Sequence, residues 1–308
     1  MKSEELNVNI EASVVIPTYN RANILKRTLE RLFTQTYPPD KYEIIVVDDG
    51  STDNTEKMVR SLRAPCSLIY LKQDKKGASA ARNYGIREAR GEIIIFIDSD
   101  IFVNKRFVEE HIRYQKKYKD IIVRGVVIHT ANINDPTHEK MKLKDISTAF
   151  FATGNVSIRK KHLLRAGLFD EDFTEYGWED LELGIRLKRQ GMKAKTNKMA
   201  IGYHYSRRPS LRDLPDICAK EKMRGRTAVL FYRKHPTFEV RCMTHISPVF
   251  FILDRFLNWN DWTTKKCGRD LLLWLEKHNS RLLLPFLMKI ISSHFYIKGI
   301  KEALNKEL

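Results

Sequence analysis

The sequence predicts an α/β fold, with a mostly parallel sheet flanked by helices and a helical C-terminal extension. Between residues 12 and 205, short runs rich in Val and Ile alternate with helical patterns. This alternation is typical of βαβ units with right-handed crossovers. From residue 206 onward the strand pattern stops, while helical spacing of apolar residues continues. We therefore expect one domain over 1–206 and a second over 207–308.

Length, charge and cysteine content narrow the classes of protein. The 308 residues suffice for one large α/β domain with an appendage. A net charge of +17 predicts an anionic partner: nucleotide phosphates, nucleic acid or an anionic membrane surface. The four cysteines are scattered and form no C-x-x-C pair, so we expect neither a zinc site nor a disulfide framework, and a reducing cytoplasm fits. Neither a signal-peptide h-region nor an uncharged apolar run of about 20 residues is present.

The first half of the chain is expected to form buried strands that each lead into a helix. The strands are predicted at 12–16, 42–47, 67–71 and 93–97. Asn23 is a candidate cap for the first helix, Ser51 or Thr52 for the second, and small residues after Gly77 open the third. No G-x-G-x-x-G or G-x-x-x-x-G-K-[ST] motif follows the first strand, which argues against dinucleotide-binding dehydrogenases and P-loop NTPases.

The second half of this domain is expected to continue the alternation with longer loops. Helices are predicted over 105–118, from residue 160, and from Trp178 to a stop at Gly191. Strands are predicted over 121–129, 150–159 and 193–205, and polar loops over 132–144 and 169–178.

An acidic pair follows the buried strand 93–97 directly. Asp98 and Asp100 lie one residue apart, and like charges that close raise each other's pKa unless a cation neutralises them. Mg²⁺ and Mn²⁺ prefer such hard oxygen ligands, and ligands of open α/β sheets bind beyond the carboxyl ends of the strands. On its own, this D-x-D pattern favours a solvated acidic turn over a metal site.

Six motifs occur in one order, and together they are far more specific than any one of them. They are V-V-I-P-T-Y-N-R, V-V-D-D-G-S-T-D, G-A-S-A-A-R-N-Y-G-I, F-I-D-S-D, T-G-N-V-S-I and G-W-E-D-L-E-L-G-I-R-L. Over about residues 13–205 the chain resembles the family 2 glycosyltransferases of GT-A fold. The G-W-E-D segment is also similar to galactosyl- and N-acetylgalactosaminyltransferases and to bacterial chondroitin-type polymerases.

The resemblance implies a nucleotide-sugar site at the first four motifs. Pro17, Thr18 and Tyr19 would hold the base, and Asp49 would accept the N3–H of uracil, which cytosine lacks. Arg82 would reach the phosphates, and its alternative is a surface position on a helix. Asp98 and Ser99 would complete the contacts to the donor.

The resemblance also implies a metal site and an acceptor site. Asp98 and Asp100 with His204 would hold Mn²⁺ or Mg²⁺, which neutralises the leaving diphosphate. Asp180 would act as general base on the acceptor hydroxyl, while Glu179 and Trp178 would bind the acceptor sugar. Glu179 and Asp180 are also the acids expected in any first helical turn. A single displacement would invert the anomeric centre, although some relatives with a similar segment retain it.

The C-terminal region is basic and helical. Residues 212–308 hold 18 Lys and Arg against 10 Asp and Glu, and helices are predicted over 220–234, 247–257, 270–277 and 282–304. Residues 282–300 fit a basic amphipathic helix on an anionic bilayer. They fit equally well a helical cap on the catalytic domain or a dimer interface.

The leading hypothesis is a cytoplasmic glycosyltransferase that moves a sugar from a UDP-sugar to a saccharide or lipid-linked acceptor, with peripheral membrane contact as an open alternative. A nucleotidyltransferase is less favoured because P-T-Y-N-R is not its Gly-rich basic motif. A non-catalytic sugar- or membrane-binding scaffold is the alternative from another class. Nucleic acid is not expected as a partner, since no recognised motif for it is present.

Overall fold

The computed structural model describes residues 9–207, 209–259, 262, 265–278, 280 and 282–305. The N-terminal segment 1–8, for which no signal peptide is expected, lies outside the described residues. The chain forms two compact units. Unit 1 comprises Met1–Thr174 and Glu179–Arg207, and unit 2 comprises Glu175–Trp178 and Arg208–Leu308. Each unit is described by itself.

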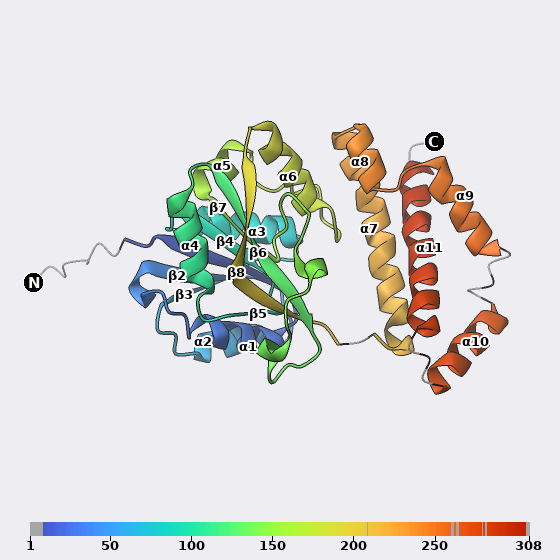
Figure 1. Ribbon diagram of the computed structural model, residues 1–308, viewed down its shortest axis with the longest axis horizontal. Helices are drawn as coiled ribbons and strands as arrows, with labels where there is room; N and C mark the ends of the chain where they lie inside the picture. Colours follow the sequence, from blue (N-terminus) through green and yellow to red (C-terminus); the bar gives the residue numbers. More distant parts are fainter. Residues whose placement is uncertain are drawn as a thin grey trace, which may run out of the picture. The chain divides into compact units, whose positions relative to one another are not determined.

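Unit 1 is built on a mixed, mostly parallel sheet of eight strands, with the order β3-β2-β1-β4-β7-β6-β8-β5 (Figure 1). The first four strands pair in parallel, as predicted. The pairs β4–β7, β7–β6 and β8–β5 are antiparallel, whereas β6 and β8 are parallel. The strands are β1 (Ala12–Thr18), β2 (Tyr42–Asp48), β3 (Ser67–Lys72), β4 (Ile93–Ile97), β5 (Ile101–Val103), β6 (Ile121–Thr130), β7 (Asn155–Arg159) and β8 (Lys193–Tyr205).

Helices cover both faces of the sheet, because side chains alternate along each strand. On β1, Val14 and Ile16 face one core and Val15 faces the other. Helices α1, α2 and α4 pack on the first core, and α3, α5 and α6 pack on the second. Their bounds are α1 (Ala22–Leu32), α2 (Thr55–Ser61), α3 (Ala78–Glu88), α4 (Phe107–Lys117), α5 (Lys160–Arg165) and α6 (Glu179–Arg189); short 3₁₀ turns lie at Pro39–Lys41, Pro136–His138 and Leu143–Asp145.

Several local predictions need correction. Asn23 is not a cap, since α1 begins at Ala22 with Arg21 in the cap position. Neither Ser51 nor Thr52 caps α2, whose cap position is Asn54. The strand expected from residue 150 begins at Asn155, and the three-residue strand β5 was not predicted. At α1 the Ala22 N–H donates to Asp53, 31 positions away, which a local pattern does not encode.

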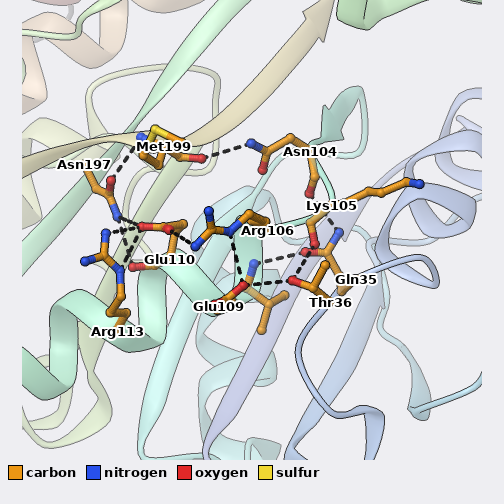
Figure 2. A network of polar contacts seen from close by, with 11 residues as sticks. Gln35, Thr36, Asn104, Lys105, Arg106, Glu109, Glu110, Arg113, Asn197 and Met199 are labelled. Atoms are coloured by element: carbon orange, nitrogen blue, oxygen red, sulfur yellow. Dashed lines mark hydrogen bonds and ion pairs between the residues drawn. The ribbon is translucent and has the colours of Figure 1, made fainter.

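A polar network fastens α4 to the sheet, and Figure 2 shows Arg106, Arg113 and Asn197 of this network around Glu110. Glu110 is 1% exposed. Its carboxylate accepts hydrogen bonds from Arg113 at 2.6 Å and from Asn197 at 2.9 Å, and it pairs with Arg106 at 3.0 Å. Burial acts to raise the pKa of Glu110, but these donors outweigh burial and hold the pKa below its ordinary value. Arg106 also pairs with Glu109 at 3.3 Å, so two arginines face two carboxylates here.

Unit 2 is helical, with η4 (Leu211–Asp213), α7 (Leu214–Lys234), α8 (Phe238–Met243), α9 (Pro248–Leu257), α10 (Lys266–Lys277) and α11 (Leu283–Asn305). Helices α7 and α11 lie side by side (Figure 1). A Cβ added at Gly225 would lie 2.1 Å from the carbonyl oxygen of Tyr296, so glycine permits this backbone approach. Met288, Ile291, Tyr296 and other α11 residues are buried.

Part of the helix expected over 282–300 is therefore buried in the core of unit 2, and its contact with a bilayer stays a prediction. Among the described residues, no helix is both long and apolar enough to cross a membrane. The cap and dimer interpretations of the extension stay predictions.

Candidate active site

The carboxyl ends of β1 and β2 meet at one edge of the sheet, where Asp49 N–H donates to the carbonyl of Thr18 at 2.9 Å. The Asp49 carboxylate is 7% exposed and is fixed by three donors: Gln73 Nε2 at 2.7 Å, Lys76 N–H at 2.8 Å and Gly77 N–H at 3.0 Å. A carboxylate offers about four lone-pair positions. One position on Oδ2 is therefore left for a further donor.

Arg82 contacts three acidic residues that come from two other motifs. Its guanidinium lies on α3, is 5% exposed, and reaches Asp98 beyond β4 at 3.3 Å. It also reaches Glu179 at 3.1 Å and Asp180 at 3.7 Å, both in the first turn of α6. Burial acts to lower the pKa of Arg82, but the three carboxylates outweigh burial and raise it. The alternative of a surface arginine is thus wrong.

Asp180 is held by Thr153. The Thr153 N–H donates to its Oδ2 at 2.9 Å, and the Thr153 hydroxyl lies 2.9 Å and 3.1 Å from its two oxygens. Burial raises the pKa of Asp180, Arg82 and Thr153 lower it, and Glu179 and Asp98 raise it; the net result is a pKa of about 6. A carboxylate with this pKa can take up a proton near neutral pH.

Asp100 lies beside His204 because β5 pairs with β8. The pairing places Ile101 opposite His204, and Asp100 Oδ2 lies 3.5 Å from His204 Nε2. Arg21 pairs with the same carboxylate oxygen. Burial acts to raise the pKa of Asp100, but His204 and Arg21 outweigh burial and lower it. Two of the three expected metal ligands are therefore adjacent, while Asp98 is turned to Arg82.

A metal ion is compatible with this arrangement only if other ligands complete its shell. Within the described part of the chain, no group of three or more His, Cys, Asp or Glu side chains is arranged to hold a metal ion. Mg²⁺ in particular is commonly bound by one or two carboxylates together with substrate phosphates and water. The oxygen and imidazole donors of Asp100 and His204 fit such an ion.

Among the described residues, three buried polar atoms without a hydrogen-bond partner lie on the motif residues: the Thr18 hydroxyl, the Ser79 hydroxyl and Arg82 Nε. Other such atoms, including Asn104 Oδ1 and Gln115 Oε1, lie outside the motifs. Each of the three motif atoms belongs to a residue at most 5% exposed. Because buried polar groups are normally paired, these three atoms favour a polar ligand or water in this region.

The remaining predicted donor residues lie near the same edge. Pro17 is half-buried in β1, and Tyr19 is 38% exposed with the Lys75 ammonium 4.0 Å from its ring centroid. Ser99 is buried, and its carbonyl accepts from Thr28 at 2.8 Å. Their roles in donor binding stay predictions.

Trp178 departs from the simple expectation of an open platform for a sugar. It has a positive φ of 73° and is 8% exposed. Its indole N–H donates to the carbonyl of Arg224 at 2.9 Å, and its ring stacks on Phe231 at 5.8 Å. Trp178 belongs to unit 2, whereas the next residue, Glu179, belongs to unit 1. Stacking of an acceptor sugar on this ring stays a prediction.

Four residues that contact predicted site residues were not named from the sequence: Arg21, Gln73, His129 and Thr153. Arg21 follows P-T-Y-N and Thr153 opens T-G-N, so motif membership was a usable signal for both. His129 lies opposite His204 in the β6–β8 register, with 3.1 Å between their Nδ1 atoms. Neither His129 nor Gln73 carries a sequence signal for its partner.

Comparisons with known proteins identify the family of the chain. The family model described as glycosyl transferase family 2 matches residues 13–171. A second model, described as the N-terminal domain of galactosyltransferase, matches residues 136–208. The chondroitin synthase of Escherichia coli is 33% identical over 235 residues, which cover 62% of this chain and 34% of that protein. The chain thus spans about a third of that relative.

Solved structures share the fold. The Pyrobaculum calidifontis mannosyltransferase PcManGT, in complex with GDP-Man and Mn²⁺, aligns with a TM-score of 0.65 at 19% identity, covering 97% of this chain and 88% of that one. S. aureus TarS 1-349, in complex with UDP-GlcNAc, aligns with a TM-score of 0.55 at 17% identity, covering 95% and 91%. The expected GT-A fold is confirmed. Since the first family model spans just over half of its residues, the chain is a glycosyltransferase that belongs to glycosyl transferase family 2.

Proposed function

We propose that this glycosyltransferase moves a sugar from a UDP-sugar to a saccharide or lipid-linked saccharide, with the help of Mn²⁺ or Mg²⁺. The convergence of Asp98, Glu179 and Asp180 on Arg82 carries the proposal. The buried Arg82 guanidinium thereby connects Asp98, which is proposed to face the donor, with Glu179 and Asp180 of α6, which are proposed to face the acceptor. A transferase needs both substrates at one point.

The preference for uracil rests on Asp49. Its carboxylate is fixed by three donors and has one acceptor position left. Uracil N3 carries a proton and cytosine N3 does not. One neighbour complex holds UDP-GlcNAc and the other holds GDP-Man. They support a nucleotide-sugar donor for this chain, and the nucleotide-sugar panel described below tests which base it carries.

Asp100 and His204 would hold the divalent ion, with Asp98 nearby. The bound ion supplies positive charge to the diphosphate as it leaves. Arg82 adds a fixed positive charge within reach of Asp98. Arg21, which pairs with Asp100, would neutralise the charge of that carboxylate.

Asp180 is the proposed general base, and Glu179 is proposed to bind an acceptor hydroxyl. With its pKa raised to about 6, Asp180 is ionised at neutral pH and basic enough to accept the hydroxyl proton. Attack by that oxygen on the anomeric carbon breaks the bond to UDP in one displacement. An α-linked donor would then give a β-glycoside.

The test is a panel of nucleotide-sugars incubated with the purified full chain, with Mn²⁺ and then with EDTA. Slow hydrolysis is expected without acceptor, because water can replace it. UDP should appear from one UDP-sugar, stop with EDTA, and be lost in Asp100→Ala. Glu56→Ala removes a carboxylate 40% exposed on α2 and serves as the control that keeps activity.

Two outcomes would contradict the proposal. Release of GDP but not UDP would refute the assignment of Asp49 to uracil. No release from any donor, together with no nucleotide binding by calorimetry, would favour the non-catalytic scaffold.

A further inference from the structure

Helix α9 of unit 2 buries its polar side and exposes its apolar side. Asp254 and the following Asn258 are 8% and 6% exposed. Val249, Ile252 and Phe256, which recur at helical spacing, are 69%, 69% and 74% exposed. A helix at the surface of a water-soluble protein normally has the opposite arrangement. The exposed side of α9 therefore suits an apolar surrounding.

Polar contacts fix α9 in this orientation. Asp254 Oδ1 lies 2.9 Å from His294 Nδ1 on α11 and accepts from Asn258 Nδ2 at 3.0 Å. Lys301 Nζ lies 3.5 Å from Asp254 Oδ2. A rotation of α9 that buried its apolar side would remove these partners from a buried carboxylate, which is costly. The exposure of the apolar side is thus built into unit 2.

The apolar side of α9 continues onto neighbouring residues. Leu253 and Leu257 of α9 line a cavity of about 300 Å³ together with Phe286 and Lys289 of α11. Phe286 is 61% exposed. We call Val249, Ile252, Leu253, Phe256 and Trp259 the α9 surface.

The positive charge around the α9 surface favours an anionic bilayer over a second copy of the chain as its binding partner. Residues 212–308 carry 18 Lys and Arg against 10 Asp and Glu, and Arg255 and Lys289 are exposed beside the α9 surface. A second copy of the chain would bring the same positive charge to the contact and be repelled. An anionic bilayer attracts such charge and accepts apolar side chains at its boundary. Trp259, 72% exposed, is a residue type enriched at that boundary.

We propose that the α9 surface binds an anionic lipid bilayer in the plane of its interface. Ile252 and Phe256 enter the boundary between headgroups and acyl chains, and Arg255 and Lys289 contact anionic headgroups. This inference goes beyond the sugar-transfer reaction and does not depend on it.

The experiment is flotation of the full chain with vesicles of phosphatidylcholine and phosphatidylglycerol, and with phosphatidylcholine alone. The wild type should float with the anionic vesicles. Ile252→Gln with Phe256→Gln should weaken binding about tenfold or more, because two large apolar side chains are lost. Leu164→Gln, at a residue 52% exposed on α5 of unit 1, is the matched control and should float as the wild type does.

A second pair tests the basic residues. Arg255→Gln with Lys289→Gln should lower binding to anionic vesicles about tenfold, remove most of its salt dependence, and leave nucleotide-sugar hydrolysis unchanged. No flotation of the wild type, or equal flotation of every variant, would overturn the proposal. A dimer that Ile252→Gln with Phe256→Gln dissolves, without any vesicle binding, would assign the surface to a second copy.

Discussion

Two ionic networks of unit 1 use the same residue types and differ in their balance of charge. Around Glu110, Arg106 and Arg113 meet the carboxylates of Glu109 and Glu110. Around Arg82, three carboxylates converge on one guanidinium. The difference appears in the pKa values, since that of Glu110 is lowered and that of Asp180 is raised to about 6.

The difference teaches which network serves the fold. A balanced network satisfies its buried groups and joins α4 to β8 (Figure 2). An excess of carboxylate costs free energy in the folded state and is typical of sites that handle charge or protons.

Arg82→Met should have the largest effect. The substitution leaves three carboxylates without their cation at a position where Arg82 is only 5% exposed. The free energy of unfolding should therefore fall by about 3 kcal/mol or more. Nucleotide-sugar hydrolysis should be lost as well. Arg113→Met is the control, because its side chain is 48% exposed and Glu110 keeps Arg106; it should cost about 1 kcal/mol. Equal losses in chemical denaturation would refute the contrast.

The pH dependence should have opposite signs in the two networks. Asp180 has a raised pKa, so its contribution to stability is present below its unfolded pKa and is lost as the pH rises through about 6. Glu110 has a lowered pKa, so its contribution is present above its unfolded pKa and is lost as the pH falls through its folded value. Sugar transfer should decline below about pH 6 as Asp180 becomes protonated. A rate that is flat from pH 5 to pH 7 would contradict the role of Asp180 as base.

Thr153→Val should have a smaller effect. Valine keeps the shape and the N–H of residue 153 but removes the hydroxyl that lies 2.9 Å from Asp180 Oδ2. Loss of one hydrogen bond to a carboxylate costs about 1 kcal/mol, so the transfer rate should fall about fivefold. The acid limb of the pH profile should also move to higher pH, because the ionised form has lost a donor. Thr244→Val in unit 2 is the control and should not move that limb.

Much of the fold could be predicted from the sequence, because runs such as 93–97 are buried on both faces and stay apolar throughout. The structure brings the motif residues Arg82, Asp98, Glu179 and Asp180 together, and their predicted roles stay predictions. The contacts of Thr153 with Asp180 and of Arg21 with Asp100 were not predicted, since they join residues 27 and 79 positions apart. Such pairs depend on how the loop after β1 meets the loop before β5, and on the loop before β7, which local patterns do not encode.

The most direct test of the account measures stability and rate together in two matched amide variants. Asp180→Asn should lower the transfer rate about a hundredfold or more and leave the melting temperature unchanged or higher, since it removes one of three crowded carboxylates. Glu110→Gln should lower the melting temperature by several degrees, in keeping with a loss of about 2 kcal/mol, and leave the rate unchanged. If Asp180→Asn lowers the melting temperature and keeps its rate, the carboxylates around Arg82 serve the fold and the proposed active site is wrong.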